Sequence, residues 1–213
     1  VPHGGEHGGE EHGGHGGGEH GRDEHREHDR NNRDRDHDGD REHVRPKQER
    51  HEARQEEVRK AREIWGGLRT LRANLHDLTR NPRNNNYINN AYSVLTAVIT
   101  NLHRLERLNN KALQDNHRTE QGLANLGVDA TKRERLLHMF ANENRVHRIF
   151  LVQMAELRRL VNNSIRDACT NAPDNQIKQK WTDARSKANE AMDTLELFIR
   201  INTRDLNNLG SFR

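Results

Sequence analysis

Apolar residues recur every three or four positions from Val58 to the C-terminus, which is the spacing of one helix face. The last run follows a 4-3-4-3-4-3 spacing, and its members are Ile177, Trp181, Ala184, Ala188, Ala191, Leu195 and Phe198. Leu206 and Leu209 resume this run after a one-step shift through Asn202. The preceding run includes polar members and consists of Leu136, Phe140, Glu143, His147, Phe150, Met154, Leu157, Val161, Ser164 and Ala168. The two earlier runs are Tyr92, Leu95, Ile99, Leu102 and Leu105, and Val58, Ala61, Trp65, Leu68, Leu75 and Leu78. This near-heptad repeat predicts long helices that pack as in coiled coils.

Helix-breaking residues separate the four runs. Asn81-Pro82 ends the first run and Gly127 the second, Asp129 can cap the third helix, and residues 171–174 contain a proline that separates the last two. The predicted helices therefore lie near 47–80, 87–125, 129–170 and 173–209. Because the helices are similar in length and the connections are short, neighbours should run antiparallel. This predicts an all-α, antiparallel up-down-up-down four-helix bundle over residues 46–213. Within the first helix, Gly66-Gly67 either produces a kink or lets a neighbour approach closely.

The segment before the bundle has a different composition. Residues 3–43 contain no aliphatic or aromatic side chain, and they hold 11 of the 16 glycines. Such a segment has no apolar surface to bury, so nothing offsets the entropy cost of ordering it. We therefore expect residues 1–45, called the arm below, to be a disordered, low-complexity His/Gly/Asp-rich region.

Histidines are the chemically distinctive residues of the arm. Nine of the 15 histidines lie there: His3, His7, His12, His15, His20, His25, His28, His37 and His43. Neutral imidazole is the commonest protein ligand for zinc, copper and nickel, and the nearby Asp and Glu add oxygen ligands. The composition predicts loosely bound divalent transition metal (Zn, Cu or Ni). A soluble spacer and a pH-responsive segment are the alternatives that need no metal.

Counting residues from each turn gives a map of height along the bundle. On this map His51, His117 and His138 lie at nearly the same level, which would suit a second metal site. The alternative interpretation is that these three histidines lie on the surface in contact with solvent and bind no metal. The same map places Arg200 opposite Glu143, with His147 and Asn202 close by. These four residues are expected to form a buried polar layer that fixes helix register; a pocket for a hydrophobic ligand or haem is the alternative.

Arginine outnumbers lysine 29 to 7, and the body beyond residue 50 is basic. A polyanion such as a sulfated glycan, or an extracellular matrix, is therefore a candidate partner, although carboxylates are interleaved throughout. Cys169 is the single cysteine, so a disulfide scaffold is excluded. Cys169 could link two chains in a homo-oligomer or remain an unpaired thiol. No apolar stretch approaches the roughly 20 residues of a membrane span.

These observations lead to one expectation of function and two alternatives. No nucleophile–base set, phosphate-binding loop or His-Glu-x-x-His motif occurs, which argues against an enzyme. We expect a non-enzymatic metal-binding protein whose arm captures ions. The alternatives are a structural or interaction protein whose arm is a pH- or metal-responsive tether, and a bundle that binds a hydrophobic ligand, haem or polyanion. The first residue is Val1, which is consistent with signal-peptide removal, and we expect secretion.

Overall fold

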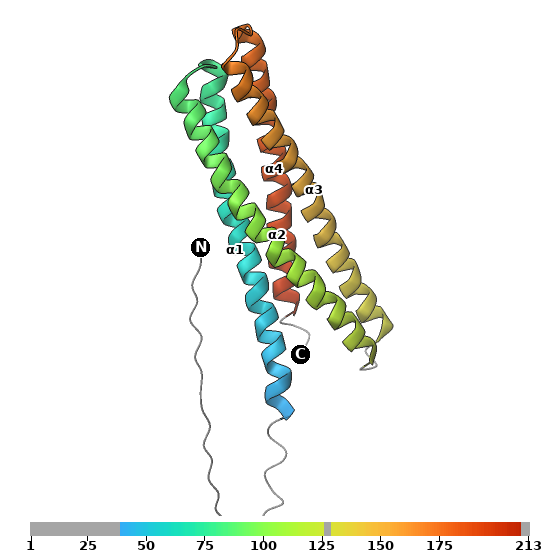
Figure 1. The fold of residues 1–213 in the computed structure, drawn as a ribbon. Coiled ribbons are helices and arrows are strands. Elements are labelled where there is room, and N and C mark those ends of the chain that lie inside the picture. The colour runs from blue at the N-terminus through green and yellow to red at the C-terminus, as the bar shows by residue number, and fades with distance from the viewer. Residues whose placement is uncertain (1–38, 126–128, 210–213) are drawn as a thin grey trace, which may run out of the picture. The chain divides into compact units, whose positions relative to one another are not determined.

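The computed structural model describes residues 39–125 and 129–209, and within these ranges the chain is four α-helices without a strand (Figure 1). The helices are α1 (Gly39–Arg80), α2 (Asn85–Asn125), α3 (Ala130–Ala168) and α4 (Asp174–Leu209). No helix in these ranges is long and apolar enough to cross a membrane. The arm was expected to be disordered, and its residues 1–38 lie outside the described residues.

The helices are arranged as the heptad spacing predicted. Helix α1 packs along α2 and α4, α3 packs along α4, and the contact between α2 and α3 is much smaller. Consecutive helices run in opposite directions (Figure 1). Helices α1 and α3 are therefore diagonal across the core. The all-α, up-down-up-down four-helix bundle is confirmed, with one thinly packed seam between α2 and α3.

Helix ends follow from local chemistry, with one exception. The Asp129 side chain caps α3 by accepting a hydrogen bond from the Thr131 N–H at 3.3 Å, as predicted. Helix α1, however, begins at Gly39, eight residues before the expected start at residue 47. Residue 47 follows Pro46, which has no N–H to bond to the preceding turn. Opposite charges at helical spacing continue upstream of it, and the structure describes residues 39–45 as part of α1.

A strict alternation of three- and four-residue steps describes the buried face of each helix. The predicted run in α4 is confirmed, because all seven of its members from Ile177 to Phe198 are buried. In α2 the prediction was wrong at Tyr92, whose exposed fraction is 57%. The buried residue is its neighbour Ala91, because one residue turns the chain by about 100° around a helix. The buried face of α2 is therefore Ala91, Leu95, Val98, Leu102 and Leu105.

The two connections at one end of the bundle are joined to each other. The Trp181 indole N–H of α4 donates to the Pro82 carbonyl oxygen of the α1–α2 connection at 3.0 Å. From the same connection, the Arg83 guanidinium donates to the carbonyl oxygens of Ala168 and Thr170, each at 2.7 Å. It also donates to Ala172 and to the Asp174 carboxylate. This end of the bundle is closed by hydrogen bonds over an apolar core.

Candidate functional site

A buried ion pair crosses the core between the diagonal helices. Arg54 of α1 donates from Nη1 to Oε1 of Glu143 in α3 at 2.6 Å. Both side chains are buried, and the guanidinium carbon lies 5.3 Å from the centroid of the Phe140 ring. Removing two charges from water is expensive, and the pair is tolerated because each charge has the other as its partner. The contact with the aromatic ring adds a smaller cation–π attraction.

Carboxyl groups outnumber the guanidinium at this level. Glu57, Glu143 and Asp205 are all buried near Arg54. Burial raises the pKa of Glu57 to about 7, with a smaller opposing effect of the Arg54 charge. Burial also raises the pKa of Glu143 to about 8; Arg54 lowers it, and a hydrogen bond with Asp205 raises it.

Asp205 is buried beside Glu143, and a hydrogen bond between the two carboxyl groups contributes to the raised pKa of Glu143. No N–H group of the described residues donates a hydrogen bond to either Asp205 side-chain oxygen. The nearest cation among them is the guanidinium of Arg204, whose Nε lies 3.5 Å from Oδ1.

Three of the four residues expected in the polar layer are buried. Glu143, His147 and Asn202 are buried, and the Asn202 amide donates to the Phe198 carbonyl oxygen of its own helix at 2.9 Å. Arg200 was predicted wrongly. It is exposed and pairs with Glu196 at 2.7 Å on the surface of α4. The height map took no account of direction around the helix, so it missed that Glu143 pairs with Arg54 of α1 and lies beside Asp205 of α4.

His147 lies between this layer and the α2–α3 seam. Its residue surface is 3% exposed, and its ring packs against Phe198 with centroids 5.6 Å apart. The Nε2 atom is buried and has no hydrogen-bond partner. An unsatisfied buried polar atom costs about 1–3 kcal/mol. Burial lowers the pKa of His147, against an opposing effect of the Glu106 carboxylate, so the imidazole is neutral at pH 7.

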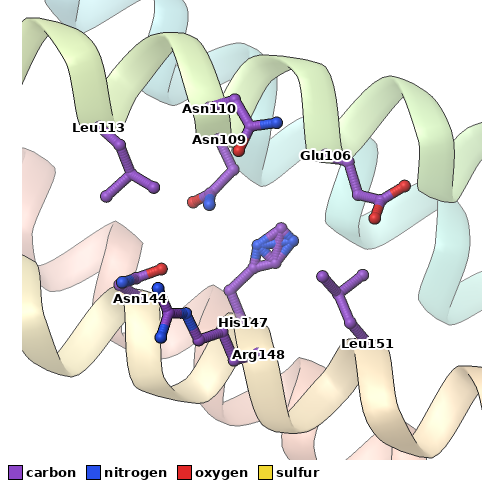
Figure 2. Close-up of a pocket in the computed structure, with 8 residues that line it drawn as sticks. All are labelled: Glu106, Asn109, Asn110, Leu113, Asn144, His147, Arg148 and Leu151. Atoms are coloured by element: carbon purple, nitrogen blue, oxygen red, sulfur yellow. The ribbon is translucent and has the colours of Figure 1, made fainter.

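A cavity of about 150 Å³ adjoins this imidazole, and Figure 2 shows it between α2 and α3. Helix α2 contributes Glu106, Asn109, Asn110 and Leu113. Helix α3 contributes Asn144, His147, Arg148 and Leu151.

The lining explains why the seam is thin. On both helices the lining residues follow the same i, i+3, i+4, i+7 spacing, which is the face that one helix turns towards its partner. Three of the four positions on each helix are polar, so the apolar packing that joins the other helices is missing here. A small, polar cavity of this kind does not favour haem or a hydrophobic ligand.

The second predicted metal site receives no support from the described side chains. His51 and His138 are both exposed, and the side chain of His117 lies outside the described residues. No group of three or more His, Cys, Asp or Glu side chains in the described part of the chain is placed to hold a metal ion. Of the nine arm histidines, eight lie in residues 1–38, outside the description, and His43 falls within α1. Cys169 is an exposed free thiol at the C-terminal cap of α3, so its two alternatives both remain open.

Sequence reasoning missed Arg54, Glu57, Asn109 and Asp205, all of which are buried. The sequence did contain a signal for their burial, because Arg54, Glu57 and Asp205 continue the alternating four- and three-residue spacing of the buried positions. From Phe198 it continues to Asn202 and Asp205, where the prediction had shifted by one step to Leu206. From Ala61 it continues backwards through Glu57 to Arg54. The prediction had followed apolar residues and not the spacing itself.

Comparison with known proteins gives no relative. No family model matches the chain, and neither a curated protein nor a solved structure matches it.

Proposed function

We propose that this protein is a non-enzymatic metal-binding protein whose histidine-rich arm captures zinc, copper or nickel and whose bundle carries the arm. The observation that carries the proposal is the presence of nine histidines among residues 3–43, interspersed with glycine and acidic residues. Imidazole and carboxylate are effective ligands for these ions, and glycine lets a chain wrap around them.

The charge of the arm supports reversible capture. Residues 1–45 contain 7 Lys and Arg and 13 Asp and Glu, which gives a net charge of −6. A divalent cation reduces this negative charge. Free histidine titrates near pH 6.5, so mild acid would protonate the ligands and release the ion.

The test is calorimetric titration of zinc, and then copper, into the full chain and into a variant in which all nine arm histidines are replaced by glutamine. The full chain should bind several ions at about pH 7 and lose them at about pH 5, because imidazole must be neutral to bind. The matched control replaces the exposed body histidines His51, His103 and His138 by glutamine and should bind as the unmodified chain does. Equal binding by the chain without arm histidines would overturn the proposal.

A second role uses the same ligands. Repeated His-Gly-Gly-Glu units offer several equivalent sites, so one ion could be shared by two chains. The arm would then act as a metal-responsive tether for assembly. Light scattering during the zinc titration separates the two roles: reversible growth of particles supports the tether, and a monomer that saturates supports capture alone.

A further inference from the structure

We propose that the cavity between α2 and α3 binds a small zwitterionic molecule of the α-amino-acid type, held between Glu106 and Arg148. None of the residues that line this cavity belongs to the arm, and the proposal does not rest on metal capture. The cavity volume of about 150 Å³ is below the roughly 300–1,000 Å³ of sites for drug-sized ligands, which limits the occupant to a small molecule.

The first argument is the unpaired imidazole nitrogen. His147 Nε2 is buried without a partner and its ring borders the cavity, so the folded chain leaves one strong hydrogen-bonding atom unsatisfied. A polar ligand in the cavity would supply the missing partner. The buried Asn109 amide and the half-buried Asn144 amide lie on the two facing helices beside the imidazole and add both donors and acceptors.

The second argument is the pair of opposite charges. Glu106 comes from α2 and Arg148 from α3, and in Figure 2 the carboxylate and the guanidinium lie on opposite sides of the His147 imidazole. Glu106 Oε2 lies 3.0 Å from His103 Nδ1, within hydrogen-bond distance. The carboxylate can still accept further hydrogen bonds, because it has two oxygens with about four lone-pair sites.

A ligand with a single charge would match one end of this cavity and oppose the other. A zwitterion matches both ends: its ammonium group would face Glu106 and its carboxylate would face Arg148, whose planar fork suits carboxylates. Leu113 and Leu151 provide apolar surface for a short side chain.

The experiment uses the full chain in a chelator-containing buffer, so that a failure of metal capture cannot affect the result. The probes are glycine, L-alanine, L-serine and L-valine, titrated by calorimetry and by NMR of the His147 side-chain nitrogens. Ethylamine, propionate and glycerol serve as single-charge and neutral comparisons. We expect saturable binding of at least one amino acid, a shift of the His147 Nε2 resonance, and affinity at least about tenfold weaker for every comparison molecule.

Two neutral variants test the two ends. Glu106→Gln and Arg148→Gln should each weaken amino-acid binding by about tenfold or more. Glu196→Gln and Arg200→Gln remove the same charges from an exposed pair on α4 and should leave binding unchanged. The proposal is overturned if no amino acid binds below about 10 mM, or if the single-charge or neutral molecules bind the unmodified chain equally well. Unchanged affinity in both Glu106→Gln and Arg148→Gln would overturn it as well.

Discussion

Two adjacent glycines in the middle of α1 offer a test of how closely the helices approach. A Cβ atom added at Gly67 would lie 2.6 Å from Cγ2 of Val98 on α2, whereas one added at Gly66 would meet nothing within 4 Å. The helix passes through both residues without interruption. The sequence had left open a kink or a close approach, and the contact with Val98 supports a close approach at Gly67.

Alanine substitutions at Gly66 and Gly67 should change the stability differently, because only Gly67 faces Val98. Both glycines lie in the same helix, so each substitution serves as the control for the other. Replacing a helical glycine by alanine gains about 1 kcal/mol of stability through helix propensity. Gly66→Ala should therefore raise the free energy of unfolding by about 1 kcal/mol. Gly67→Ala has the same gain, but forcing a methyl group against Val98 costs about 1–3 kcal/mol. Gly67→Ala should therefore be between neutral and about 2 kcal/mol destabilising.

Urea denaturation followed by far-UV circular dichroism measures this difference. The slope of free energy against urea should be the same for both variants, because neither changes the surface exposed on unfolding. In thermal unfolding, a difference of 1 kcal/mol corresponds to about 2–4 °C for a domain of this size.

Removing the obstructing methyl groups supplies the control. In a Val98→Ala background, Gly67→Ala should become stabilising by about 1 kcal/mol, as Gly66→Ala is in the original chain. If Gly67→Ala stabilises the unmodified chain as much as Gly66→Ala does, the close α1–α2 contact is refuted.

Three further predictions concern the two ends of the bundle. Arg83→Ala removes the donors that join the two connections and should cost about 2 kcal/mol in urea denaturation, whereas the exposed Arg80→Ala should change little; equal effects would refute the joining role. The folded-state pKa values of Glu57 (about 7) and Glu143 (about 8) exceed the unfolded value of 4.5. The folded chain therefore retains protons that the unfolded chain releases. The free energy of unfolding should fall as pH rises from 4.5 to 8. Denaturation across this range should show the decline, and Glu57→Gln should reduce it by roughly 3 kcal/mol; an unaltered decline would contradict the burial of an ionisable carboxyl there. Arg54→Met should cost about 3 kcal/mol, and more at about pH 9 than at about pH 5, because Glu143 is then ionised without its partner; a pH-independent loss would be the contrary result.

The heptad spacing predicted the fold because helix length, turn position and buried face all derive from local sequence. The α4 run from Ile177 to Phe198 shows this, as does the cap at Asp129. The start of α1 was missed because charged side chains at helical spacing extend the helix beyond its apolar face, whereas the predicted helix began near residue 47. Tyr92 was misplaced because its neighbour Ala91 is small and contributes little to an apolar pattern.

The polar layer was only partly predictable. Glu143, His147 and Asn202 could be identified because each interrupts an apolar run at a core position. Arg54 could not be paired with Glu143 from sequence, since the contact joins residues 89 positions apart across the diagonal of the bundle. The cavity was not predictable either, because it depends on how two polar faces meet.

The polar residues divide the bundle into two parts with different physics. Towards the α1–α2 and α3–α4 connections, the seam positions are apolar except Ser164, and Trp181 and Arg83 close that end with hydrogen bonds. Further along the same seams, Arg54 and Glu143 occupy the interior, and a neutral His147 borders the gap between α2 and α3. Burial of apolar surface is the main source of folding stability, so the apolar part should hold the helices together while the polar part is the one able to separate locally. The heptad repeat therefore positions a charged, hydrogen-bonding interior beside a thin seam, which is where a small polar ligand could enter without disturbing the rest of the core.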